Sequence, residues 1–258
     1  MATVIRTGPR PPHFWRAEAG GGRRLDLCNP REIKGLLARH GFRFSKSMGQ
    51  NFLIESWVPR EIAAASGADG SSGVLEIGPG IGPLTAELAQ RAGRVVCVEL
   101  DHSLLPILAE TLAPYDNVEV IQGDVMKLDL RALAEEKLAG FSPMVCANLP
   151  YNITTPVLTA LIEARRFSAI TVMIQREVAR RICASPGSGE YGAFSVFCQY
   201  HTRPDLLFVV EPQCFLPAPK VTSAVVRLVP RTQPPQERVE EGFFFRVVRA
   251  CFADRKSV

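Results

Sequence analysis

The stretch GVLEIGPGIG (73–82) is the part of the sequence that decides the fold class. Its apolar residues predict a buried β-strand, and the residues after it predict a helix. Gly78, Gly80 and Gly82 lie between these two elements, where glycine lets the backbone turn sharply and approach a ligand closely. We therefore expect a strand, a glycine loop and a helix in direct succession.

The same alternation continues along the chain. Strands are predicted at RVVCVELD (94–101), VEVIQGD (118–124) and MVCANLPY (144–151), and AITVMIQREVARRI (169–182) starts as a strand and continues as a helix. Short apolar strands that alternate with helices are typical of a parallel sheet covered on both faces. LLFVVEP (206–212) and SAVVRLVP (223–230) predict a closing antiparallel pair. The predicted fold is an α/β, Rossmann-like domain with a mostly parallel sheet over residues 29–230.

The residues before this domain differ in composition. Residues 1–28 are rich in Pro, Gly and Arg and lack an apolar period, which predicts a flexible basic tail. Residues 1–46 carry a net charge of +7, whereas the rest of the chain sums to −3. A basic arm suits a polyanionic partner, but a solvated leader has the same composition. The prolines and the glycine run oppose the amphipathic helix of a mitochondrial transit peptide.

Both ends of the predicted domain carry helix signals. Asn29 is suited to cap a helix that has Pro30 in its first turn. Residues 231–238 are typical of a linker, and residues 240–258 predict a basic amphipathic helix. A lone helix of this length is marginal by itself, so it either docks on the body of the protein or begins a further domain.

Composition argues against several classes of protein. No apolar run approaches the roughly 18–20 residues of a spanning helix, so we expect no membrane span. The seven cysteines include no CxxC pair and the four histidines are scattered, so we expect no metal site. Cysteines without a secretory leader indicate a reducing compartment, and the expected location is cytoplasmic.

Acidic residues follow the glycine loop at the ends of the next two strands. Glu99 ends the second strand and Asp124 ends the third. In an open parallel sheet the carboxyl ends of the strands meet in one crevice, so these side chains should converge on the glycines. The tight GxGxG spacing favours a nucleoside cofactor without a pyrophosphate. By itself such a loop is as often a tight packing turn.

The segment Asn148-Leu149-Pro150-Tyr151 at the end of the fourth strand suggests the reaction. An exocyclic amine on adenine is a poor nucleophile because its lone pair is delocalised into the ring. The side-chain oxygen of Asn148 and the backbone carbonyl of Pro150 could accept its hydrogens and aim the lone pair at a methyl group. Tyr151 could stack on the flipped base. The alternative is an Asx/Pro turn with a core tyrosine.

The chain resembles the ribosomal RNA adenine N6,N6-dimethyltransferase family, most closely its small-subunit 16S (kasugamycin-sensitivity) branch. The resemblance covers about residues 29–256. The motifs that carry it are GQNFL (49–53), EIGPGIGPLT (76–85), VELD (98–101), GDVMKLD (123–129), NLPYNITTPVL (148–158), EYGAFSV (190–196) and FLPAPKVTSAVVRL (215–228).

The resemblance implies S-adenosyl-L-methionine as the cofactor, and it assigns roles to residues. Gln50, Asn51 and Leu53 would close over the cofactor, Gly78 would lie against its methionine part, and Glu99 would bind the ribose. Phe215 would face Tyr151 across the flipped adenine. The implied catalytic residues are Asn148, Leu149, Pro150, Tyr151 and Phe215, and the implied cofactor-binding residues are Gln50, Asn51, Leu53, Gly78, Gly80, Glu99, Asp124, Val125 and Asn148.

The implied partner is 16S rRNA or a precursor of the small ribosomal subunit, and the implied state is a monomer. Residues 231–258 would be the linker and first helix of a small C-terminal helical domain, most of which lies outside this chain. Three alternatives stay open: a 23S rRNA dimethyltransferase, a ribosome assembly or mitochondrial transcription factor of the same fold, and a DNA adenine methyltransferase.

Some residues depart from the family pattern. Ala193 stands where relatives often have a basic residue, and Thr222 replaces a common aspartate. The candidates for contacts with RNA phosphates are Arg43, Lys46, Arg165, Arg166, Arg180, Arg181 and Lys220, each of which is individually more often a solvated surface charge.

Overall fold

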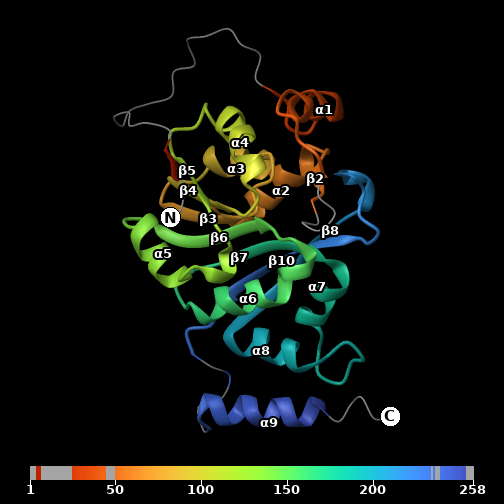
Figure 1. Ribbon diagram of the computed structural model, residues 1–258. Coiled ribbons are helices and arrows are strands. Elements are labelled where there is room, and N and C mark those ends of the chain that lie inside the picture. Colours follow the sequence, from red (N-terminus) through yellow and green to blue (C-terminus); the bar gives the residue numbers. More distant parts are fainter. Residues whose placement is uncertain (1–3, 7–24, 45–49, 234, 236–238, 254–258) are drawn as a thin grey trace.

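In the computed structural model, a twisted β-sheet forms the centre of the protein (Figure 1). The structure describes residues 4–6, 25–44, 50–233, 235 and 239–253. Within them, the large sheet has the order β1-β5-β4-β3-β6-β7-β10-β8. Its strands are β1 (Val4–Arg6), β3 (Ser72–Ile77), β4 (Arg94–Glu99), β5 (Val118–Gln122), β6 (Ser142–Asn148), β7 (Ile170–Gln175), β8 (Thr202–Val210) and β10 (Ser223–Pro230).

The strand directions confirm the predicted mostly parallel sheet. Strands β5, β4, β3, β6 and β7 run parallel to one another. Strand β10 pairs antiparallel with both β7 and β8, which is the closing pair expected from the sequence. Because β3 lies between β4 and β6, the chain reverses its direction of winding at β3, and the crevice at such a switch point is where ligands bind in open α/β sheets.

Helices cover both faces of the sheet (Figure 1). One hydrophobic cluster joins the sheet to α1 (Pro30–Arg39), α2 (Trp57–Ser66), α3 (Pro83–Ala89) and α4 (Leu105–Thr111). A second cluster joins it to α5 (Leu130–Lys137), α6 (Thr154–Glu163), α7 (Arg176–Cys183) and α8 (Ala193–His201). The strands between the two clusters direct apolar side chains to both faces of the sheet, because both faces are covered by helices.

Local signals explain how the first helix begins. The side chain of Asn29 accepts hydrogen bonds from the backbone N–H groups of Arg31 and Glu32, at 2.9 and 3.4 Å. The predicted cap is therefore confirmed, with Pro30 as the first helical residue. Before this helix, Val4–Arg6 form β1, which pairs antiparallel with β5, so part of the segment expected as a flexible tail is an edge strand. The rest of that tail up to residue 24 lies outside the described residues.

The last helix, α9 (Glu241–Ala253), lies outside the two layers and contacts α8 (Figure 1). The rings of Tyr200 and Phe244 stack there with their centroids 5.0 Å apart. This helix therefore contacts the body of the protein through α8. In the part of the chain that the structure describes, no helix is long and apolar enough to cross a membrane.

Candidate active site

One pocket opens at the carboxyl ends of β3, β4, β5 and β6. It encloses about 1060 Å³ of space outside the protein atoms, including solvent at its mouth. All the residues predicted as catalytic or cofactor-binding line this pocket. The structure therefore brings together segments that are spread over more than 160 positions of the sequence, from Gln50 to Phe215.

The glycine loop forms the floor of the pocket beneath the N-terminus of α3. Gly78, Gly80 and Gly82 have φ angles of 68°, 63° and 93°, in the left-handed region that side chains disfavour. A Cβ added to Gly80 would lie 3.3 Å from the ring of Phe52, so a side chain there would disturb the segment that covers the loop. The glycines thus serve both the turn and the close packing above it.

Glu99, at the end of β4, lies beside this loop and is almost fully buried. Its Oε1 accepts a hydrogen bond from the backbone N–H of Asp101 at 2.8 Å. Burial raises the pKa of Glu99 to about 7, because a charged carboxylate loses its hydration there. The Glu99 carboxyl group can therefore accept hydrogen bonds from hydroxyl groups, and its own charge changes near neutral pH.

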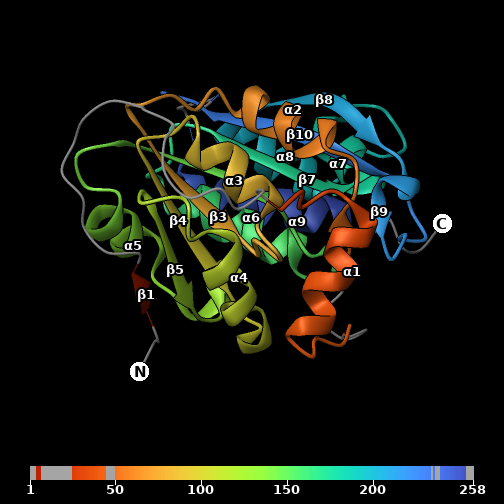
Figure 2. The same ribbon diagram turned by 90° about the horizontal axis from the view of Figure 1, so that it is seen from above.

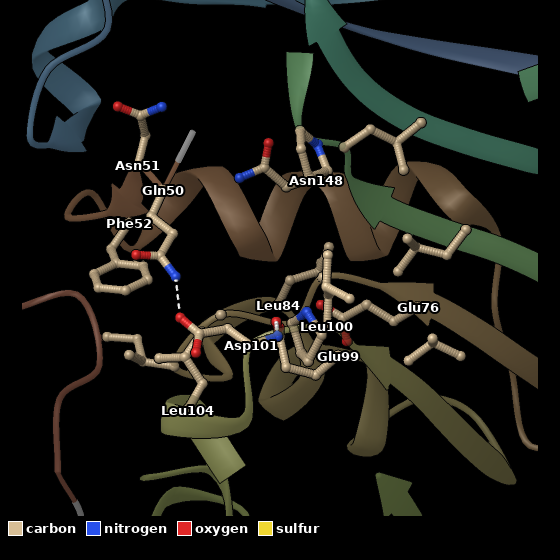
Figure 3. A pocket seen from close by; sticks show the side chains of 18 of the residues that line it. Gln50, Asn51, Phe52, Glu76, Leu84, Glu99, Leu100, Asp101, Leu104 and Asn148 are labelled. Atoms are coloured by element: carbon tan, nitrogen blue, oxygen red, sulfur yellow. Dashed lines mark hydrogen bonds between the residues drawn. The ribbon is translucent and has the colours of Figure 1, made fainter. Parts of the chain in front are cut away.

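Sequence reasoning missed a second buried carboxyl group, that of Glu76 on β3. Figure 3 shows Glu76 and Glu99 in the wall of the same pocket. The Cys97 thiol lies 3.6 Å from Oε2 of Glu76, and the Thr85 hydroxyl also bonds this carboxyl group. Burial raises the pKa of Glu76 from its ordinary value of 4.5 to about 8. A lone acidic residue inside the apolar run GVLEI was the signal that could have revealed it.

Asp124 follows β5 and caps the short 3₁₀ helix η3 (Val125–Lys127). Its Oδ1 accepts from the backbone N–H of Met126 at 3.0 Å, and its Oδ2 lies 3.7 Å from Nζ of Lys127. The cap fixes the carboxylate at the mouth of the pocket. Leu100 lines the same pocket and is 52% exposed, which leaves an apolar surface for a planar ligand.

The segment from Gln50 to Leu53 covers the pocket from the side of α1 and α2. Nε2 of Gln50 donates to Oδ2 of Asp101 at 2.7 Å, as the dashed line in Figure 3 shows. Strand β2 (Phe52–Leu53) pairs antiparallel with β9 (Phe215–Leu216), and Leu53 stands opposite Phe215. The segment that covers the glycine loop is therefore hydrogen-bonded to the segment that carries Phe215, and the two form one small sheet.

Asn148 ends β6, and its side chain points into the cavity (Figure 3). The structure gives the carbonyl of Pro150 other partners than the one expected: it accepts from the backbone N–H of Ile153 at 3.2 Å and from the Thr154 hydroxyl at 3.1 Å. Ile153 ends the 3₁₀ helix η4 (Tyr151–Ile153), and Thr154 is the first residue of α6. In contrast, no group among the described residues donates a hydrogen bond to the Leu149 carbonyl.

Tyr151 and Phe215 supply the aromatic walls of the pocket. The hydroxyl of Tyr151 lies 2.6 Å from Oγ of Ser223, the first residue of β10. Burial raises the pKa of Tyr151 above its ordinary value, so this hydroxyl stays protonated near neutral pH. Phe215 is 3% exposed and is the first residue of β9.

The basic residues predicted to contact RNA phosphates differ in whether they form ion pairs. Four of them form ion pairs: Arg165 with Glu241, Arg166 with Glu135, Arg180 with Glu190 and Arg181 with Glu177. Lys46 lies outside the described residues. Arg43 and Lys220 have no ion-pair partner in the described ranges.

Comparisons with known proteins agree with this pocket. The family model described as ribosomal RNA adenine dimethylase matches residues 41–258. A protein of Geobacillus thermodenitrificans named ribosomal RNA small subunit methyltransferase A is 48% identical over 233 residues, which are 90% of this chain and 80% of that protein. A protein of the same name from Bacillus cereus is 47% identical over the same shares.

Two solved structures share the fold. A dimethyladenosine transferase from Plasmodium falciparum has a TM-score of 0.68 and 27% identity, over 78% of this chain and 70% of that one. The 23S rRNA methyltransferase ErmE has a TM-score of 0.68 and 29% identity, over 80% and 81% of the two chains. With a family match over most of its length and with every residue that the family motifs predicted lining one pocket, the chain belongs to the ribosomal RNA adenine dimethylase family.

Proposed function

We propose that this protein transfers methyl groups from S-adenosylmethionine to N6 of adenine in 16S ribosomal RNA, giving N6,N6-dimethyladenosine. The observation that carries the proposal is that Asn148 and Tyr151 line the same pocket as Gly78 and Glu99. A site for an adenine amine and a site for a nucleoside cofactor are therefore adjacent. Relatives named small subunit methyltransferases, at 48% identity, favour 16S rRNA as the substrate.

The residues present fit this cofactor. S-adenosylmethionine supplies a methyl group that is activated by attachment to a positively charged sulfur. Glu99 is buried at the strand end with an acceptor oxygen for the ribose hydroxyls, and Asp124 is fixed at the mouth to accept from the adenine amine. Gly78 has a φ angle of 68° and carries no side chain, so its backbone can approach the ligand closely.

The chain's own role in the reaction is to orient the target amine. We propose that the side-chain oxygen of Asn148 and the carbonyl of Leu149 accept the two amino hydrogens of adenine. This assignment replaces the Pro150 carbonyl with that of Leu149, because the Pro150 carbonyl already accepts two hydrogen bonds. Holding both hydrogens favours a pyramidal nitrogen whose lone pair faces the cofactor. Positioning of this kind is the main contribution that a protein can make to such a transfer.

The aromatic residues hold the base during two successive transfers. The Tyr151 ring stacks on one face of the flipped adenine and Phe215 contacts the other, so an unstacked RNA base is required. In the first transfer the nitrogen gains one methyl group and releases one proton to solvent, so it still carries one hydrogen, which one acceptor can hold. The second transfer therefore needs no additional residue.

A 23S rRNA substrate is the second candidate, because the structure of the 23S rRNA methyltransferase ErmE matches this chain with the same TM-score, 0.68, as the Plasmodium falciparum dimethyladenosine transferase. We prefer 16S rRNA as the substrate because the chain is 48% identical to a small subunit methyltransferase and 29% identical to ErmE. We further propose that the protein acts as a monomer in the cytosol, in keeping with its seven free cysteines. Sedimentation of the purified protein tests the monomeric state.

The decisive experiment measures methyl transfer from labelled S-adenosylmethionine to unmethylated 30S subunits. Parallel reactions contain 50S subunits, 23S rRNA and duplex DNA, and the product nucleosides are separated afterwards. We expect N6,N6-dimethyladenosine from the 30S reaction alone. Labelling of 23S rRNA instead would establish the second candidate, and labelling of none of the four would refute the proposed activity.

A further inference from the structure

A second pocket lies beside the proposed target site, between α7 and the loop that leads into β10. Its lining residues include three cationic side chains, those of Arg176, Arg180 and Lys220, together with Glu190 and Thr222. It shares no lining residue with the cofactor pocket. Arg176 lies outside the family motifs and is not one of the basic residues predicted from the sequence to contact RNA phosphates.

Ion pairing leaves this pocket with a positive charge. Arg180 is neutralised by Glu190 at 2.9 Å, and the other acidic residue of the lining, Glu177, is held by Arg181 at 3.1 Å. Arg176 and Lys220 are both exposed, and neither side chain has an ion-pair or hydrogen-bond partner within the residues that the structure places. Two cations thus face the pocket without a counter-charge, which is the arrangement expected for an anionic ligand.

The backbone places this charge next to the aromatic wall of the target site. The backbone N–H of Arg176 donates to the carbonyl of Thr222 at 2.9 Å, which joins the start of α7 to the residue before β10. The next residue, Ser223, has its hydroxyl 2.6 Å from that of Tyr151. Only one residue of β10 therefore separates the charged pocket from the side chain proposed to stack on the adenine.

We propose that this pocket binds a phosphate group of the RNA strand next to the flipped adenine, with Arg176 and Lys220 as its cationic ligands. The inference rests on the proposed function and adds to it the place where the strand is held. A flipped nucleotide keeps a phosphate on each side of its ribose, so an anion lies close to the base in any bound RNA. Phosphate contacts set the position of a strand, whereas base contacts set specificity.

The test compares Arg176→Gln and Lys220→Gln with Arg60→Gln as a matched control. Arg60 is an exposed arginine on α2 that lines neither pocket, so its replacement removes the same charge elsewhere. Binding of unmethylated 30S subunits is measured as a function of salt, and steady-state methyl transfer is measured at one salt concentration. Affinity for S-adenosylhomocysteine is measured for every variant.

For each pocket variant we expect KM for the 30S subunit to rise about 5- to 10-fold. The slope of the logarithm of the binding constant against the logarithm of the salt concentration should fall in magnitude by about 0.7. This is the change expected when one contact with a single-strand phosphate is lost. The turnover number and the affinity for S-adenosylhomocysteine should stay unchanged, and Arg176→Lys should keep most of the wild-type slope because it keeps the charge. The Arg60→Gln control should behave as wild type.

Two results would overturn the phosphate site. One is a KM and salt slope for the pocket variants equal to those of Arg60→Gln; the other is a loss of turnover at unchanged KM, which would place these residues in the chemistry. Both results presuppose an active wild-type protein. An inactive wild-type protein with intact cofactor binding would instead refute the proposed function.

Discussion

The hydroxyl of Tyr151 lies 2.6 Å from the hydroxyl of Ser223, so a residue of the loop after β6 is tied to the first residue of β10. These strands are not neighbours, because β7 lies between them in the sheet. The orientation of the Tyr151 ring is therefore fixed by the closing antiparallel strand as well as by its own loop. Because the Tyr151 ring is already held in place, it can stack on a base at a lower entropic cost.

Replacing Tyr151 should separate stacking from this hydrogen bond. Tyr151→Ala removes the ring, and loss of one stacked base costs about 1–3 kcal/mol, so kcat/KM for the 30S subunit should fall about 5- to 150-fold. Tyr151→Phe keeps the ring and loses only the bond to Ser223, so its loss should be several times smaller. Steady-state methylation kinetics measure both. Equal losses in the two variants would show that the ring itself does not bind the base.

Asn148→Ala should remove methyl transfer more strongly than cofactor binding. Loss of one acceptor aimed at the reacting amine should lower the turnover number by about 100-fold or more, by analogy with other oriented hydrogen-bonding groups at reacting centres. The neighbouring Asn152 is exposed and does not line the pocket, so Asn152→Ala is a matched control that should retain activity. Single-turnover methylation and calorimetric binding of S-adenosylhomocysteine measure the two effects. If both fall equally in Asn148→Ala, Asn148 serves the cofactor alone.

Cofactor affinity should depend on pH through Glu99. Its pKa is about 7, and only the ionised carboxylate accepts fully from two hydroxyls, so affinity should rise with pH from 6 and level off above about 7 to 8. The gain is at most about tenfold per pH unit for one group. Glu99→Gln should bind S-adenosylhomocysteine more weakly at pH 8 and with a flatter pH profile. A wild-type profile that stays flat from pH 6 to 8 would contradict this role.

Glu76 should make folding stability depend on pH. Its pKa is raised to about 8 in the folded protein, so the folded state keeps a proton that the unfolded chain releases near pH 4.5. This stabilising contribution is complete below pH 4.5 and is lost as the pH rises to about 8, by at most about 1.4 kcal/mol per pH unit. Urea unfolding at pH 6, 7 and 8 should show a smaller decline for Glu76→Gln than for the wild type. Parallel declines would mean that Glu76 is ionised in the folded protein.

The sequence by itself determined the order of the strands along the chain and the residues at their ends. Apolar runs that alternate with helices can be read locally, and the glycines of the loop mark a turn that other residues disfavour. Because parallel strands present their carboxyl ends at one edge, Gly78, Glu99, Asp124 and Asn148 could be expected to meet before any coordinates were known.

The tertiary structure decided which groups already have partners. In the sequence the carbonyls of Pro150 and Leu149 are equivalent hydrogen-bond acceptors. Only the structure shows that the Pro150 carbonyl already accepts from Ile153 and Thr154. Glu76 becomes a buried acid because the Cys97 and Thr85 side chains close around it. Such pairings depend on distances through space, which the periodicity of a sequence does not encode.

The charged pocket shows most clearly which properties the sequence determines and which the tertiary structure decides. Arg176 and Arg180 stand on one short helix and look alike in the sequence, yet Arg180 pairs with Glu190 while Arg176 faces the residues before β10. The pairing of β10 with β7, which joins positions almost 50 residues apart, brings those residues to Arg176. The sequence determined the strands, the glycine loop and the cofactor-site residues because these are local patterns. Only the fold decided which cation has a counter-charge, because electrostatic pairing depends on separation in space.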